Sequence, residues 1–444
     1  MPETRKYTVV DLFAGVGGLS YGFSRNDRFE IILANEMQKD IAKAYTLNHP
    51  AVNMLQGDIK DLSEDVLRQT IGNRTVDVVV GGPPCQSYST LGKRQMDARA
   101  NLFMEYKRVL CILHPRAFLF ENVKGILSMD KGTLFEHVRK EFEDIGYSLQ
   151  YKILNAVDYG VPQLRERVIL VGFLGENNFQ YPEPTHGEGL LPYVTLQNAL
   201  KDLPALACGE ESTMYAAPPD NEFLSWVRQS GSDMLTEHKS PNNSAHLRKI
   251  MAALKDGQGK DDLPEELRPK SGFKNTYAKL WWEKPATTIT RNFSCPSSSR
   301  CIHPRDSRAL TIREGARLQS FPDNYRFYGS DCLKRLEIGN AVPPLLSVAL
   351  AEQMSEYLDK MLAKREKVVI AAESGKKMTA LAAMYASERG YSFIPVANDD
   401  LPTYLAKQQQ KGCVVFDGAE NEREIENTCR ELRIPLRHCK LEGA

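Results

Sequence analysis

Several features that define other classes of protein are missing from this chain of 444 residues. No apolar run approaches the roughly 18 residues that a membrane-spanning helix needs. The beginning, Met1–Lys6, has no apolar signal region. The nine cysteines show no paired CxxC spacing, so neither a zinc site nor a disulfide framework is indicated. These absences predict a protein without membrane contact in a reduced, cytoplasmic compartment.

The formal net charge is zero, because 57 Lys and Arg residues balance 57 Asp and Glu residues. A polyanion would therefore have to be met by a local basic surface. Such a surface is suggested between Arg291 and Arg335, where nine basic residues, eight of them Arg, accompany four acidic ones. Arg suits contacts with phosphates and base edges. A solvated surface would have the same composition, and residue counts alone do not separate the two interpretations.

What is present is an ordinary globular composition, with 42% hydrophobic and 26% charged residues, in a chain long enough for two or three domains. Residues 1–175 alternate short apolar runs with helical stretches. This pattern predicts an α/β fold with a doubly wound, mostly parallel sheet covered on both faces. The expected strands are 8–13, 30–34, 77–80, 117–120 and 167–173.

The rest of the chain changes texture twice. Residues 176–305 are rich in Pro, Gly, Ser and Asn with little periodicity, which predicts a loop-rich domain inserted into the first. Regular structure is expected to return over 306–365, with a helix over 343–361 that opens with prolines. Residues 366–444 are expected to form a small α/β extension of unknown role, with strands at 368–370, 392–396 and 413–416.

The segment Asp11–Ser20 combines a strand end, a glycine turn and a helix start. Its glycines let a ligand approach backbone N–H groups at a helix N-terminus, but Ser20 replaces the last glycine of the dinucleotide fingerprint. Glu36 follows the second strand, where a carboxylate can bind ribose hydroxyls, and Asp58 and Ile59 follow the third. No GK[ST] motif or basic group lies nearby to hold phosphates. An adenosine ligand without phosphates therefore fits better than NAD or ATP.

A second turn, Gly81–Ser89, follows the apolar run Val78–Val80. Its two glycines permit close backbone approach, and its two prolines fix φ and remove donors, so the turn is rigid. A cysteine at a strand end before a polar loop is placed like a nucleophile, although a free cysteine is often an inert buried side chain. Cys85 is therefore the candidate nucleophile, whereas Cys111, in an apolar run, is expected to be buried filler.

Six motifs, in order and spacing, resemble the cytosine-5 DNA methyltransferase family over approximately residues 7–362. They are Asp11–Gly18, Pro83–Gln86, Glu121–Val123, Gln163–Arg167, Leu310–Pro322 and Gly339–Pro344. The gap between Arg167 and Arg308 falls where that family carries its target-recognition domain. The resemblance implies a class I S-adenosylmethionine methyltransferase fold, and a sequence-specific DNA (cytosine-5-)-methyltransferase of the bacterial modification type.

The resemblance also implies roles for single residues. Cys85 would add to carbon 6 of cytosine, so that carbon 5 can take a methyl group from S-adenosylmethionine. Glu121 would hold or protonate ring nitrogen 3, Arg165 would contact the extruded nucleotide, and Arg167 would order the site around it. Taken singly, Glu121 could be an exposed acid at a strand end, and the two arginines a solvated pair in a turn.

Cofactor contacts carry over from the family to thirteen positions: Phe13, Ala14, Gly15, Gly17, Gly18, Glu36, Met37, Asp58, Ile59, Pro83, Leu102, Asn340 and Val342. Met37 would lie against adenine, unless it is core filler. Leu102 would close the methionine side of the pocket. No metal is expected.

Duplex DNA buries carbon 6 of cytosine, so the base must be flipped out. The polar segment 86–99 would then be a mobile lid, and Gln86, Ser87, Arg291 and Arg308 are the expected DNA contacts. Phosphate contacts would supply affinity and salt dependence, while residues 176–305 would choose the sequence.

The expected partner is double-stranded DNA bound by a monomer, and a restriction endonuclease of the same system would need no stable complex with it. Three alternatives stay open. A tRNA cytosine methyltransferase uses the same motifs, but the Cys-Phe-Thr tripeptide of that branch is absent. A non-catalytic DNA-binding relative could lack Cys85, Glu121 or Arg165, all of which are present. A small-molecule methyltransferase would have no use for the Arg-rich segment. The target sequence cannot be deduced from these residues.

Overall fold

The computed structural model describes residues 6–84, 102–175, 177–229, 231, 234–270, 275–363, 367–371, 392–396 and 414–416. The chain divides into two compact units, Met1–Ser355 and Glu356–Ala444, and each is described by itself. The division does not separate residues 176–305 from the sheet, so the expected inserted domain belongs to the same compact unit as the rest of the first 355 residues.

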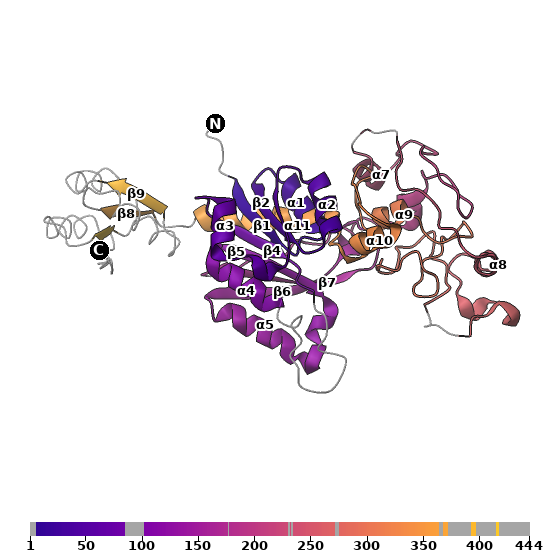
Figure 1. The fold of residues 1–444 in the computed structure, drawn as a ribbon, viewed down its shortest axis with the longest axis horizontal. Helices are drawn as coiled ribbons and strands as arrows, with labels where there is room; N and C mark the ends of the chain where they lie inside the picture. The colour runs from indigo at the N-terminus through magenta and orange to yellow at the C-terminus, as the bar shows by residue number, and fades with distance from the viewer. Residues whose placement is uncertain are drawn as a thin grey trace. The chain divides into compact units, whose positions relative to one another are not determined.

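The first unit contains a seven-stranded sheet (Figure 1). Its strands are β1 (Tyr7–Leu12), β2 (Phe29–Glu36), β3 (Asn53–Gln56), β4 (Val78–Gly81), β5 (Ala117–Val123), β6 (Tyr147–Asn155) and β7 (Glu166–Leu174). The strand order is β3-β2-β1-β4-β5-β7-β6. Neighbours are parallel except β7, which is antiparallel to β5 and β6. The predicted doubly wound, mostly parallel sheet is confirmed.

The two strands without a predicted range, β3 and β6, lack a continuous apolar run. In β6 only Tyr147 and Leu154 are buried, because the strand lies at the edge of the sheet and most of its side chains are half-buried or exposed. The four residues of β3, at the opposite edge, are all at least partly exposed. Burial on both faces produces the apolar run by which a central strand is recognised, and edge strands lack it.

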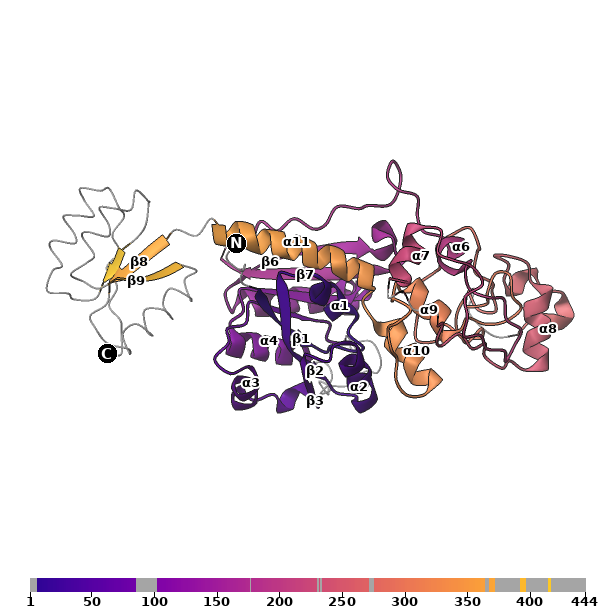
Figure 2. The same ribbon diagram turned by 90° about the horizontal axis from the view of Figure 1, so that it is seen from above.

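Helices cover both faces of the sheet. They are α1 (Gly18–Arg25), α2 (Lys39–Asn48), α3 (Glu64–Ile71), α4 (Leu102–Leu113), α5 (Thr133–Glu143) and α11 (Pro344–Ala363). Side chains of α3, α4 and α5 share one core cluster with the sheet, and Figure 2 shows α11 on the other side of the sheet from α3 and α4. Helix α11 packs on α1 so closely that a Cβ at Gly22 would lie 2.2 Å from the carbonyl carbon of Ser347.

The remaining helices of the first unit are short. They are α6 (Leu196–Leu200), α7 (Glu222–Val227), α8 (Ala245–Ala253), α9 (Ile312–Leu318) and α10 (Asp331–Asn340). A second core cluster joins side chains of α6 and α7 to those of α9 and the residues that follow it. Within the described part of 176–305 the chain forms helices, turns and isolated bridges but no strand, as the loop-rich texture predicted.

No helix in the described ranges is both long enough and apolar enough to cross a membrane. The second unit contributes three described strands, β8 (Lys367–Ala371), β9 (Ser392–Val396) and β10 (Val414–Phe416). They form a parallel sheet in the order β10-β8-β9. The predicted strands of the extension are therefore confirmed.

Candidate active site

The glycine turn lies at the carboxyl end of β1 and leads into α1. Phe13, Gly15 and Gly17 have φ values of 57°, 56° and 93°, a left-handed conformation that only glycine adopts without strain. Gly17 is the N-cap of α1 and offers no side chain to cap it. The first N–H groups of a helix without a side-chain cap are free donors. The turn can therefore present the N–H groups at the start of α1 to a ligand.

Glu36, the last residue of β2, lies beside this turn. Its Oε2 accepts a hydrogen bond from the Gly15 N–H at 3.0 Å, and its Oε1 accepts one from the Gln38 N–H at 2.8 Å. Burial is the main influence on the carboxyl and raises its pKa, and these two hydrogen bonds oppose that rise. A carboxylate held in this way faces the edge of the sheet where parallel strands end, as ribose binding requires.

The last of the six family motifs, Gly339–Pro344, packs onto the start of α1. A Cβ at Gly18 would lie 2.3 Å from the Val342 carbonyl oxygen, so only glycine allows this approach. Val342 itself is buried, whereas Asn340, at the end of α10, is exposed. Two segments more than 300 residues apart thus meet at the candidate cofactor site.

The other expected cofactor residues surround the same edge of the sheet. Asp58 follows β3 and accepts a hydrogen bond from the Lys60 N–H at 3.1 Å, while Ile59 is buried. Met37 is 62% exposed, which rules out core filler for this side chain. Pro83, after β4, is buried and its carbonyl accepts a hydrogen bond from Asn122 Nδ2 at 3.0 Å. Ala14 is buried, and Leu102 is half-buried at the start of α4.

Glu121 and Arg167 form the ion pair of the candidate catalytic site. Glu121 comes from β5 and Arg167 from β7, which pair in antiparallel register with Arg167 opposite Val123. Arg167 Nε lies 2.7 Å from Glu121 Oε1, and both side chains are about nine-tenths buried. A Cβ at Gly82 would lie 2.7 Å from Glu121 Oε2, so the glycine after β4 leaves the space that this carboxylate occupies.

Arg165 has a different environment from the one expected. Its side chain is fully buried, and the guanidinium donates to the carbonyl oxygens of Ile289, Gly339 and Ala341, each at 2.9 Å. Burial, reinforced by the positive charge of Arg167, lowers the pKa of this guanidinium. Arg165 faces the protein interior in this structure, which contradicts the expectation that it contacts an extruded nucleotide.

No role was expected for Gln163. Together with Arg165 it forms an interior junction between the segment before β7 and later parts of the chain. Its Nε2 donates to the Leu318 carbonyl at 2.6 Å and to Gln319 Oε1 at 2.8 Å. Its Oε1 accepts a hydrogen bond from the Ile289 N–H at 2.9 Å. The junction joins β7 to segments from the later part of the chain, and no local pattern in the sequence signals such a long-range bond.

The candidate nucleophile Cys85 and two expected DNA contacts, Gln86 and Ser87, lie outside the described residues, as does the expected lid over 86–99. Arg291 is exposed, and its backbone packs against the end of α10, where a Cβ at Gly339 would lie 2.3 Å from the Arg291 nitrogen. Cys111, expected to be buried, is exposed on α4.

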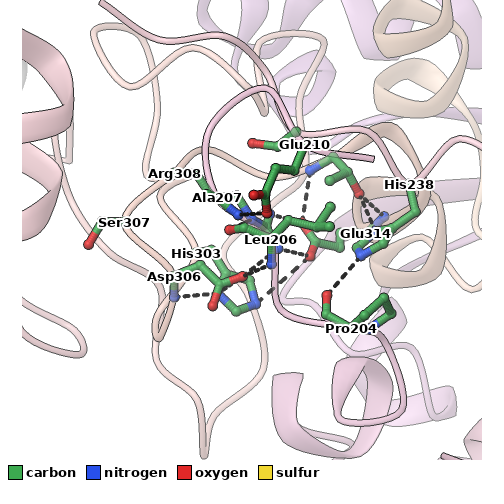
Figure 3. A network of polar contacts seen from close by, with 12 residues as sticks. Pro204, Leu206, Ala207, Glu210, His238, His303, Asp306, Ser307, Arg308 and Glu314 are labelled. Carbon is green, nitrogen blue, oxygen red and sulfur yellow. Dashed lines mark hydrogen bonds and ion pairs between the residues drawn. The ribbon is translucent and has the colours of Figure 1, made fainter. Parts of the chain in front are cut away.

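The expectation that Arg308 contacts DNA is wrong, because this side chain is 1% exposed. Its guanidinium binds both carboxylate oxygens of Glu314 at 2.8 Å and Asp306 Oδ2 at 2.7 Å (Figure 3). Arg313 and Arg317 are also fully buried. Part of the Arg-rich segment is therefore an internal network of ion pairs. Only the exposed basic residues of this segment are candidates for contact with DNA.

Comparisons with known proteins agree with this geometry. The family model for C-5 cytosine-specific DNA methylases matches residues 7–356. Type II methyltransferase M1.HphI of Haemophilus parahaemolyticus is 36% identical over 349 residues, covering 78% of this chain and 86% of its own. Type II methyltransferase M.DdeI of Desulfomicrobium norvegicum is 36% identical over 377 residues, covering 79% and 89%. A putative DNA modification methyltransferase encoded within an E. coli prophage superimposes with a TM-score of 0.66 at 25% identity, over 80% of this chain and all of that one.

A doubly wound sheet, a glycine turn and a buried Glu–Arg pair, together with this match, place the chain in the C-5 cytosine-specific DNA methylase family. The fold is that of the class I S-adenosylmethionine methyltransferases. The protein is a DNA (cytosine-5-)-methyltransferase. The family match ends at residue 356, one residue beyond the end of the first compact unit at Ser355.

Proposed function

We propose that the chain is a sequence-specific modification enzyme of the Type II restriction–modification kind. It would transfer a methyl group from S-adenosylmethionine to carbon 5 of a cytosine flipped out of duplex DNA. The similarity to two Type II methyltransferases supports the modification role. The observation that carries the chemistry is the Glu121–Arg167 pair, held at 2.7 Å at the same edge of the sheet as the glycine turn.

The residues around the glycine turn fit S-adenosylmethionine. The turn offers backbone donors without any group for binding several phosphates, and Glu36 lies where ribose hydroxyls would be. Asp58, Ile59 and Met37 would hold the adenine, and Leu102 and Asn340 would lie toward the methionine end. When bound, the cofactor supplies an electrophilic methyl group. The chain's part is to bind it and hold it against the base.

On the base, the Cys85 thiolate would form a bond to carbon 6, and the electron pair displaced toward the ring would make carbon 5 nucleophilic. Glu121 would hold a proton at ring nitrogen 3, which limits the negative charge that develops there. Arg167, paired with the Glu121 carboxylate, would fix its direction. After carbon 5 takes the methyl group, loss of its proton and of Cys85 restores the aromatic ring.

Methyl transfer from labelled S-adenosylmethionine to unmethylated duplex DNA, with tRNA as the second substrate, tests this function. Bisulfite sequencing of the product would give the base and its sequence context together. Label on tRNA alone, or on neither substrate, would contradict the proposal.

The nucleophile is tested with a matched pair of cysteine variants. Cys85→Ser should abolish turnover, whereas Cys111→Ser, which changes an exposed thiol on α4, should leave it unchanged. Full activity of Cys85→Ser would contradict the covalent step while leaving the methyl transfer itself standing.

A further inference from the structure

A residue from the last part of the first unit's sequence supports the glycine turn. The hydroxyl of Tyr325 donates a hydrogen bond to the Val16 carbonyl oxygen at 2.6 Å. Tyr325 is 4% exposed. Val16 stands between Gly15 and Gly17, two of the left-handed residues of the turn. The phenol therefore holds the middle of the turn through the Val16 carbonyl group.

His49, directly after the end of α2, also lies against the glycine turn. Its Nε2 lies 3.3 Å from the Tyr325 hydroxyl. Burial lowers the pKa of His49 to about 4, so the imidazole is neutral at physiological pH. The Tyr325 hydroxyl donates its proton to Val16, and a hydrogen bond between His49 and the Gly17 backbone opposes the fall in the His49 pKa. A Cβ at Gly17 would lie 2.7 Å from His49 Nε2 and 2.9 Å from the Tyr325 hydroxyl, so both groups lie directly against Gly17.

The position of Tyr325 is set outside the turn. Its ring packs against Phe321 at 4.7 Å and Phe327 at 5.7 Å between centroids. These aromatic side chains belong to the core cluster that contains α6, α7 and α9. Close packing makes such a cluster resist small displacements. The turn is consequently supported by the part of the chain that also carries the inserted loops.

We propose that Tyr325 is a positioning residue for cofactor binding. Through its hydrogen bond to Val16 it holds the glycine turn in the conformation that presents the N–H groups at the start of α1 to S-adenosylmethionine. The inference rests on the proposed function, since it requires the glycine turn to be the cofactor site. It predicts that the Tyr325 hydroxyl contributes to cofactor affinity but not to the chemical step.

Tyr325→Phe in the full chain tests the hydroxyl while keeping the ring in its cluster. Tyr147→Phe is the matched control, because Tyr147 is also 4% exposed and its hydroxyl donates to the Pro115 carbonyl at 2.8 Å. Pro115 precedes β5, so this bond lies at the opposite end of the parallel strands from the glycine turn. Both variants lose one buried hydrogen bond to a backbone carbonyl, and only one of them touches the turn.

The readouts are the dissociation constant of S-adenosylhomocysteine by calorimetry, KM for S-adenosylmethionine and kcat on unmethylated genomic DNA. Tyr325→Phe should raise the dissociation constant and KM about 3- to 10-fold, the range expected for one buried hydrogen bond. Its kcat at saturating cofactor should stay within about twofold of the wild type. Tyr147→Phe should change neither, although both variants should show a similar loss of thermal stability.

Unchanged affinity in Tyr325→Phe, or the same change in Tyr147→Phe, would overturn the positioning role while wild-type methyl transfer still supported the proposed function. A fall in kcat without a change in KM would overturn it as well, since the hydroxyl would then act on the chemical step. Failure of the wild-type protein to bind S-adenosylhomocysteine at all would remove the proposed function and the inference together.

Discussion

Replacing Arg308 by alanine should lower the stability of the protein rather than its affinity for DNA. The guanidinium makes a two-pronged contact with Glu314 at 2.8 Å and binds Asp306 at 2.7 Å. It also donates to the Leu206 carbonyl at 3.1 Å and the Ala309 carbonyl at 3.2 Å. Figure 3 shows Arg308 lying together with Leu206, Asp306 and Glu314. Alanine would leave the buried Glu314 and the half-buried Asp306 without their cation.

The size of the effect follows from the burial of both partners. Arg308 and Glu314 are each 1% exposed, and removing one member of a buried pair costs about 3–5 kcal/mol. Arg308 holds the pKa of Glu314 below its usual range, even though burial by itself would raise it. Glu314 keeps one hydrogen bond, from the Thr311 N–H at 2.8 Å, which does not neutralise its charge. An unfolding entropy of about 2.1 cal/mol/K per residue gives about 1.3 °C per kcal/mol for a unit of 355 residues, so Tm should fall by about 4–7 °C.

Arg291→Ala is the comparison within the same segment. Arg291 is exposed, so its removal should leave Tm unchanged. If it binds a phosphate, the slope of log K against log salt should fall by about 1. Calorimetric unfolding and fluorescence anisotropy of duplex DNA over a salt series, applied to both variants, separate the two effects.

Glu314→Gln provides a second route to the same conclusion, because it keeps the shape of the side chain and removes the buried carboxylate charge opposite Arg308, which then pairs with Asp306 alone. It should lower Tm as Arg308→Ala does. A wild-type Tm in Arg308→Ala combined with a reduced salt slope would refute the reasoning, because it would mean that the guanidinium serves DNA and not the fold.

Three further predictions concern Glu337, a buried carboxyl on α10, and two glycines of the site. Burial raises the pKa of Glu337 to about 8, so the folded protein keeps a proton on this carboxyl that the unfolded chain loses above about pH 4.5. The free energy of unfolding should therefore fall as the pH rises to 8. The Tm of Glu337→Gln should exceed that of the wild type by more at pH 8 than at pH 5. Gly18→Ala, whose Cβ would lie 2.3 Å from the Val342 carbonyl oxygen, should raise KM for S-adenosylmethionine by at least about tenfold in steady-state assays, and an unchanged KM would contradict this packing. Gly82→Ala would push on Glu121 Oε2 at 2.7 Å and should lower kcat about tenfold or more, with cofactor affinity by calorimetry unaffected.

Much of the fold was predictable because it depends on short-range patterns. Central strands such as β1, β4 and β5 are buried on both faces and appear as apolar runs, and the glycine turn after β1 must use residues that tolerate positive φ. Edge strand β6 was not predicted as a strand, because most of its side chains are half-buried or exposed.

The role of the arginines was not predictable in the same way. Eight arginines between Arg291 and Arg335 suggested a DNA surface, but Arg317 is buried with Asp202, which lies 115 residues away. Likewise, the order of Arg165 and Arg167 in the sequence does not reveal that one enters the interior and the other pairs with Glu121. Charge composition counts cations, whereas their partners are chosen by tertiary contacts.

The central strands, the glycine turn and the family could be predicted from the sequence alone, because residues close along the chain determine backbone conformation and burial at each element. Which residues pack beneath and beside these elements depended on the tertiary structure. Tyr325 under the glycine turn and Val342 against Gly18 come from segments about 300 residues further along the chain. Such contacts arise from how whole elements pack, and no local periodicity records them.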